Sequence, residues 1–113
     1  MPWWTGIFRA ALDPGVEDVT LAIGRPPLMR VHGRLVTLGG APLTEAQTMT
    51  LVEAITPPLM LRRLHALGQA EFVHILSERV QFLVHCYEFR GRVGLILRRT
   101  PQPQPHLHAG EED

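Results

Sequence analysis

Residues 23–35 read IGRPPLMRVHGRL, and this segment is the strongest indication of the architecture of the chain. Turn-forming residues occur in it twice, first at Gly24 to Pro27 and again at His32-Gly33. Glycine reaches the positive φ values that a tight hairpin turn requires. The short apolar-rich segments around the second turn therefore predict an antiparallel hairpin with strands at Leu28 to Val31 and Arg34 to Leu38.

The residues before this hairpin predict one helix and one further strand. Apolar residues recur at helical spacing near the N-terminus, which indicates a short helix that Pro14-Gly15 ends. Polar and apolar residues then alternate over residues 18–23, as is typical of a half-buried strand. The apolar positions are Trp4, Phe8 and Leu12 in the helix, and Val19, Leu21 and Ile23 in the strand.

Two helices are predicted after the hairpin. Thr44 and Gln47 have the spacing of a capping box, so a helix is expected to start at Thr44 and to end near Ile55. In Thr56-Pro57 the threonine can cap a second helix and the proline suits its first turn, while Gly68 is a natural C-terminal cap. The residues expected to face the core are Met49, Val52 and Ile55 in the first helix, and Leu61, Leu64 and Leu67 in the second.

Strands near residues 70–76, 79–88 and 92–99 complete the prediction, the last two joined by a turn at Arg90-Gly91. The expected fold is α+β, with an antiparallel sheet of about five to six strands, two central helices and a short N-terminal helix. Residues 1–100 form the expected domain. Residues 101–113, rich in proline and glutamine and then acidic, are expected to form a flexible tail.

Composition limits the classes of function. Eleven basic and 11 acidic residues cancel, so there is no overall charge to attract nucleic acid or an anionic membrane. No segment reaches the roughly 20 apolar residues that a spanning helix needs. The N-terminus lacks the basic region and cleavage site of a signal peptide. The single cysteine, Cys86, suits a reducing compartment. A cytoplasmic location without insertion into a membrane is expected.

Several motifs in matching order resemble the N-terminal domain of type IV pilus retraction and type II secretion ATPases of the PilT type. The resemblance covers about residues 5–101 and implies a PAS-like α+β fold. In that family the domain precedes a RecA-like motor, and here the chain stops at Asp113, where the motor is expected to begin. The motifs are Glu17 to Leu21, Gly24 to Pro27 with Arg30 to Gly33, Pro42 to Thr44, Gly68 to Phe72, and Arg90-Gly91 with Leu97-Arg98.

The sequence also differs from that family at the positions that the resemblance assigns to nucleotide contact. The family has an Arg-Phe-Arg-type strand whose arginines approach the nucleotide, and the matching residues here are Gln81-Phe82-Leu83. Leucine cannot neutralise a phosphate, and glutamine lacks the charged fork of a guanidinium. No Gly-x-x-x-x-Gly-Lys-Ser/Thr loop occurs in the 113 residues. We therefore expect no enzymatic activity, no catalytic residue and no cofactor.

The histidines and the cysteine do not form a recognisable metal or catalytic motif. The six histidines are scattered and lack the spacing of known zinc sites, so no metal is expected. His85 and Cys86 are neighbours on one strand and point to opposite faces, which excludes a catalytic pair. Cys86 is in phase with apolar residues and is expected in the core. The six are His32, His65, His74, His85, His106 and His108.

The candidate sites are surfaces for a protein partner. Both phases of the strand around Leu83 are apolar, with His85, Tyr87 and Phe89 on the phase of Leu83, which fits either a strand covered on both faces or a surface used by a partner. Arginines of the two hairpins, including Arg98 and Arg99, either face water or contact a protein. The candidate interface residues are Trp3, Trp4, Arg25, Arg30, Leu83, Arg90 and Arg92.

Two classes of function follow. The first is a non-catalytic interaction module that acts with a motor or another component of pilus or secretion machinery. The second is a PAS-like module that senses a small ligand, although no convergent set of polar residues marks a ligand site. Trp3 and Trp4 can equally anchor the first helix to the core. In isolation a monomer or a small homodimer is expected, because a ring contact needs a complementary motor surface.

Overall fold

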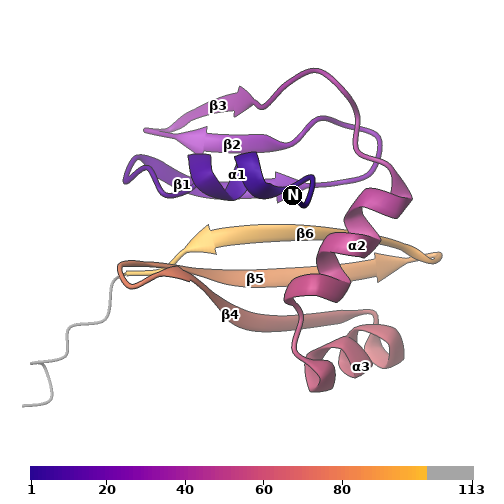
Figure 1. Cartoon of the computed structure of the whole chain (residues 1–113). Coiled ribbons are helices and arrows are strands. Elements are labelled where there is room, and N and C mark those ends of the chain that lie inside the picture. The colour runs from indigo at the N-terminus through magenta and orange to yellow at the C-terminus, as the bar shows by residue number, and fades with distance from the viewer. Residues whose placement is uncertain (102–113) are drawn as a thin grey trace, which may run out of the picture.

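The computed structural model describes residues 1–101 and has an α+β fold in which three helices pack on one antiparallel sheet of six strands (Figure 1). This confirms the predicted fold class. The helices are α1 (Thr5–Ala10), α2 (Glu45–Ile55) and α3 (Pro58–Leu67). The strands are β1 (Val16–Leu21), β2 (Leu28–Val31), β3 (Arg34–Thr37), β4 (Gln69–Ser77), β5 (Val80–Phe89) and β6 (Arg92–Arg99).

The sheet brings together strands from the N-terminal and C-terminal halves of the described residues. Its strand order is β3-β2-β1-β6-β5-β4, so β6 lies between the N-terminal strands and the β4–β5 hairpin. β1 pairs antiparallel with β6, with Val19 opposite Leu97 and Leu21 opposite Leu95. The helices lie on one face of the sheet (Figure 1), and the buried apolar side chains form one core between these two layers. The helices therefore leave the other face of the sheet without a cover in the described residues.

Both predicted hairpin turns are confirmed. His32 and Gly33 have φ values of 49° and 79°, and Arg90 and Gly91 have 54° and 78°. Two consecutive residues with positive φ define the tight turn that matches the twist of antiparallel strands. A glycine at the second position reaches this conformation without steric cost.

The N-terminal helix is shorter than predicted. α1 ends at Ala10, and Leu12, which was expected on its buried face, is 42% exposed in the turn that follows. The strand after it starts earlier than predicted, at Val16, because an irregular register between Val16 and Asp18 changes the phase of the side chains. Val16 and Val19 can therefore both be buried. Ile23 lies beyond the strand and forms an isolated bridge with Leu43.

The capping box of α2 is confirmed, but the face that the helix buries differs from the prediction. The Thr44 hydroxyl accepts from the Gln47 amide at 3.2 Å, and the Gln47 side chain accepts from the Thr44 amide at 3.0 Å. Val52 is buried as predicted, whereas Met49 and Ile55 are only partly buried. Apolar residues occur around much of the helix, so contact with the sheet selects the buried stripe. That stripe is Thr48, Leu51 and Val52.

The second helix starts and packs differently from the prediction. Thr56 does not cap α3; it ends α2, and Pro57 takes the N-cap position without a side-chain hydrogen bond. Leu64 is fully buried, but Leu67 in the last turn is 72% exposed because it turns away from the sheet. Gly68 ends the helix in the left-handed conformation with φ 83°, as predicted. Among residues 1–101, no helix has both the length and the apolar character needed to cross a bilayer.

Candidate functional site

The most distinctive surface is the face of the sheet opposite the helices, here called the open face. It is made of alternate residues of the strands, and the burial of β5 shows the division clearly: Phe82, Val84 and Cys86 are buried, whereas Leu83, His85 and Tyr87 are partly exposed. Within residues 1–101, the apolar phase around Leu83 is thus not covered from both sides. The residues of the open face include Leu83, His85, Tyr87, Ile96, Arg98, Thr20, Asp18 and Arg30, together with Val73 and Ile75 on the edge strand β4.

Strand register arranges these residues in rows across the sheet. One row runs from Val73 through Leu83, Arg98 and Asp18 to Arg30. Arg30 pairs with Asp18 at 3.2 Å in a partly exposed setting, so the pair orients the guanidinium but contributes little stability. The open face is therefore apolar at Leu83 and becomes charged toward β1 and β2.

A parallel row contains a second polar contact beside an apolar surface. The His85 ring nitrogen Nδ1 lies 3.1 Å from a carboxylate oxygen of Glu71 on β4. On the opposite flank of β5, Ile96 of the neighbouring strand β6 is the register partner of His85. Together with Leu83 and Arg98, these residues line a hollow of about 190 Å³. This volume suits one inserted side chain better than a whole small ligand, for which pockets are usually about 300–1,000 Å³.

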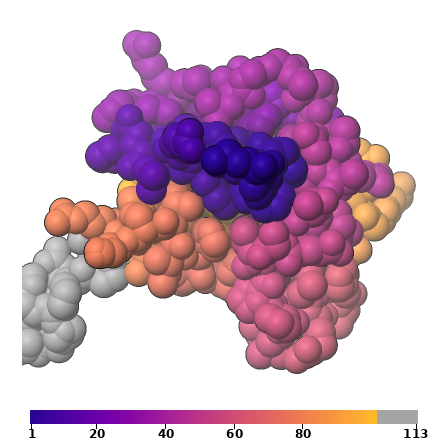
Figure 2. Space-filling model, in the orientation of Figure 1, coloured from indigo at the N-terminus to yellow at the C-terminus, as the bar shows by residue number. Residues whose placement is uncertain are grey.

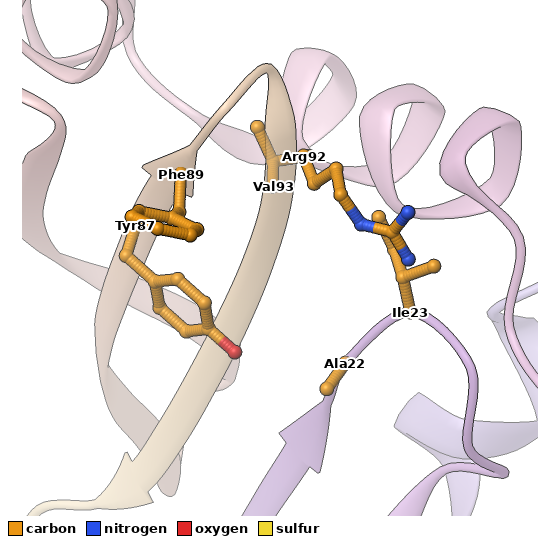
Figure 3. Close-up of a pocket in the computed structure, with 6 residues that line it drawn as sticks. All are labelled: Ala22, Ile23, Tyr87, Phe89, Arg92 and Val93. Carbon is orange, nitrogen blue, oxygen red and sulfur yellow. The ribbon is translucent and has the colours of Figure 1, made fainter.

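A second hollow of about 180 Å³ lies at the end of the open face where β1 ends and the β5–β6 turn begins (Figure 3). Tyr87 and Phe89 project from β5 on one side, and Arg92 reaches across toward Ile23 on the other. The Tyr87 ring lies directly over Gly94, where a Cβ would collide with it. Aromatic residues such as Tyr87 and Phe89 are enriched at the centres of protein interfaces.

Three of the four arginines predicted at the interface gather at this end of the sheet, whereas Arg30 lies farther along it, beside Asp18. The pairing of Leu21 with Leu95 places Arg25, in the loop after β1, at the same end as Arg90 and Arg92. The Arg90 guanidinium lies 5.1 Å from the centroid of the Phe89 ring. Arg92 is 3.6 Å from Glu45, but both side chains are more than half exposed.

Trp3 and Trp4 lie on the other side of the molecule, on the face that the helices cover. The indole N–H of Trp3 donates to the backbone carbonyl of Gln47 in α2 at 3.0 Å. The two rings pack edge to face with centroids 5.8 Å apart and rest against the core. Figure 2 shows this N-terminal segment, in indigo, lying over the helical side of the molecule. The structure therefore separates the tryptophans from the interface residues of the open face.

Arg99 has a role that the sequence did not reveal. Its guanidinium donates to the backbone carbonyls of Val16 (2.7 Å), Ala11 (2.8 Å) and Asp13 (2.7 Å). Arg99 thereby ties the end of α1 and the start of β1 to the last strand. Its partners are main-chain atoms more than 80 residues away, and such atoms leave no signal in the side-chain pattern.

The four histidines of the described residues lie on different parts of the fold. Among residues 1–101, no three His, Cys, Asp or Glu side chains come together in a way that could hold a metal ion. His65 contacts Glu88 at 3.2 Å, and His32 lies over Gly15. His106 and His108, like the predicted tail, lie outside the described residues. Cys86 is buried in the core as predicted, and burial raises the pKa of its thiol.

We expect His74 to make the stability of the domain depend on pH. It lies on β4 with its ring 5.6 Å from that of Phe8, and burial lowers its pKa below the ordinary value. In the unfolded chain the His74 imidazole has the ordinary pKa of about 6.5. As the pH falls below this value, the unfolded chain therefore binds a proton at His74 before the folded chain does. We expect stability to fall as the pH drops from about 6.5 through the lower folded pKa.

This expectation is tested by urea unfolding of dilute protein at several pH values. The difference in unfolding free energy between the wild type and His74→Leu should be constant above pH 6.5 and change in favour of the variant below it. Parallel pH profiles would show that His74 has the same pKa in both states.

The geometry defines an antiparallel α+β domain with one helix-covered face and one open face, and the same fold occurs in solved structures of a pilus retraction motor and of an ATPase. The pilus retraction motor PilT with bound ADP superposes with a TM-score of 0.75 at 24% identity, over 95% of this chain and 32% of PilT. The Legionella pneumophila ATPase DotB gives 0.69 at 18% identity, over 99% of this chain and 35% of DotB. These similarities establish the fold.

The sequence comparison also finds a pilus ATPase. The type IV pilus ATPase PilU of Pseudomonas aeruginosa is 27% identical over 101 residues, which are 89% of this chain and 26% of PilU. No protein-family model matches the chain. The predicted resemblance to pilus and secretion ATPases is thus confirmed. The chain spans about a quarter of the length of PilU and about a third of PilT and DotB.

Proposed function

We propose that this domain is a non-catalytic interaction module that binds a pilus or secretion ATPase through its open face. The observation that carries the proposal is the partly exposed apolar surface around Leu83, which the helices of the same domain leave uncovered. An apolar centre with a charged rim is the usual composition of a protein interface.

The similarity to PilU and PilT supports the choice of partner. PilT is a pilus retraction motor and PilU a type IV pilus ATPase, so this fold occurs in proteins of the pilus machinery. The net charge of zero gives no comparable support for a nucleic acid or a membrane as partner. We assign no chemistry to the domain, since the 113 residues contain no phosphate-binding loop.

Residues of the open face take different roles in this proposal. Leu83, which stands where the resemblance implies a nucleotide-approaching arginine, is the buried anchor. Its neighbours Ile96 and Val73 extend the apolar contact. Arg30 and Arg92 lie toward the rim, where charges mainly guide association and contribute little affinity. The hollow between Leu83 and Ile96 would receive a partner side chain.

Binding of the purified domain to an immobilised pilus retraction ATPase tests this proposal. We expect Leu83→Asp to weaken binding at least about tenfold, because burial of an unpaired carboxylate costs more than the roughly 1.4 kcal/mol that a factor of ten represents. Leu67→Asp is the matched control, since Leu67 is 72% exposed on α3, away from the open face.

Circular dichroism establishes that each variant is folded before binding is compared. Equal affinity of Leu83→Asp and the wild type would contradict the proposed site. Loss of binding in Leu67→Asp, with Leu83→Asp unaffected, would place the interface on the helical side instead.

A further inference from the structure

Among the residues that the structure describes, the outer edge of β4 is a second surface without a partner. β4 ends the strand order, so only β5 pairs with it among residues 1–101. It is nine residues long, whereas β3 at the opposite edge has four. Natural sheets usually protect such an edge with lysine, proline or a covering element. β4 contains neither lysine nor proline, and Glu71 is its one acidic residue.

Exposed apolar side chains lie along the same edge. Val73 is 52% exposed and Ile75 is 64% exposed, and both lie on the open face. On the helical face Phe72 and Leu76 are only partly buried against the core. Pairing with another strand would cover these side chains and satisfy the free main-chain groups together.

We infer that β4 pairs antiparallel with β4 of a second copy of this chain, so that the two sheets become continuous across a two-fold axis. Self-pairing of an antiparallel strand is an isologous contact, which closes as a dimer. This inference does not rest on the proposed function, because it follows from the free edge of β4, although Val73 borders both that edge and the surface around Leu83.

The side chains of β4 favour one register, with the two-fold axis at His74. Val73 then lies opposite Ile75 of the other copy, and Phe72 lies opposite Leu76, so apolar residues meet on both faces. An axis at Glu71 would instead place two carboxylates directly opposite each other, which is unfavourable.

Charge complementarity at the ends of the paired strands supports a second copy as the occupant. A polar hollow of about 540 Å³ lies beside the start of β4, and Arg63 and Glu71 are among the residues that line it. In the antiparallel arrangement, the exposed β4–β5 turn of the other copy, Glu78-Arg79, arrives at this hollow. Glu78 would then face Arg63, and Arg79 would face Glu71.

Sedimentation analysis over a dilution series of the full chain tests the inference. We expect a reversible monomer–dimer equilibrium, weakened at least about tenfold by Ile75→Lys, since a lysine in the paired edge is a known protection against pairing. Leu35→Lys on β3 is the matched control, because Leu35 is similarly exposed (59%) at the other edge. It should leave the dimer unchanged. A monomer at all concentrations, or a dimer insensitive to Ile75→Lys, would overturn the inference.

Cysteine crosslinking tests the register independently of affinity. In a Cys86→Ala background, His74→Cys lies at the two-fold axis, where opposite Cβ atoms are about 4.5–5.5 Å apart and a short bis-maleimide can join them. Gln69→Cys lies far from its counterpart. Efficient crosslinking of His74→Cys is expected. Preferential crosslinking of Gln69→Cys would overturn the register, and crosslinking of neither variant would show that the β4 edges do not meet.

Discussion

Replacing Phe82 with alanine is expected to lower the unfolding free energy by about 3–5 kcal/mol, which is the usual cost of removing a buried aromatic ring. Phe82 is 1% exposed at the centre of the core, on a strand with neighbours on both sides. The substitution leaves a cavity in the core. The two flanking strands, β4 and β6, cannot readily shift to fill it. Urea unfolding followed by circular dichroism measures the loss.

Leu83→Ala is the matched control for this experiment. Leu83 is the next residue on the strand and points to the open face, where it is already partly hydrated. Its truncation should cost less than about 1.5 kcal/mol. Equal losses at both positions would mean that the open face is buried in solution, as it would be in a stable assembly.

The second large effect is expected for Arg99→Ala, which should destabilise the domain by about 2–4 kcal/mol. The guanidinium satisfies carbonyl groups of Ala11, Asp13 and Val16, and bonds with a charged donor contribute about 1.5–3 kcal/mol each without being additive. It also lies 5.3 Å from the centroid of the Phe82 ring. Alanine would release the α1–β1 connection from β6.

Thermal and urea unfolding of Arg99→Ala and Arg98→Ala separate this role from a general effect of charge. Arg98 is the neighbouring residue and is exposed on the open face, so its loss should change stability by no more than about 0.5 kcal/mol. Similar effects of the two substitutions would argue against the specific contacts of Arg99.

The two proposed contacts share Val73, but they can be examined separately because Leu83 lies on β5 and Ile75 lies on the edge strand β4. Leu83→Asp addresses the centre of the open face, and Ile75→Lys addresses the outer strand β4, in the row next to that of Val73 and Leu83. A variant that loses ATPase binding but still dimerises, together with one that shows the reverse, would establish two independent surfaces. Loss of both properties in one variant would indicate that dimerisation and partner binding are linked.

Local features of this domain could be predicted from the sequence because they depend on residues close together in the chain. The turns at His32-Gly33 and Arg90-Gly91 need positive φ, which glycine supplies. The capping box of Thr44 and Gln47 spans three residues, and Gly68 ends its helix through its own backbone conformation. The alternation around Leu83 also showed that both sides of that strand are apolar.

Other features depend on which distant segments meet, and the linear pattern does not contain that information. From the sequence, the apolar residues in phase with Leu83 were consistent with either a covered or an exposed face of the sheet. In the folded domain the helices occupy only the opposite face. Met49 and Leu67 follow a helical period, yet packing on the sheet buries Leu51 and Leu64 most completely. From the sequence, Arg99 was assigned to the surface, because its carbonyl partners come close to it only in the folded domain. Dihedral preferences and caps act over a few residues, whereas burial, strand order and the free edge of β4 arise only when the two ends of the chain pair through β1 and β6.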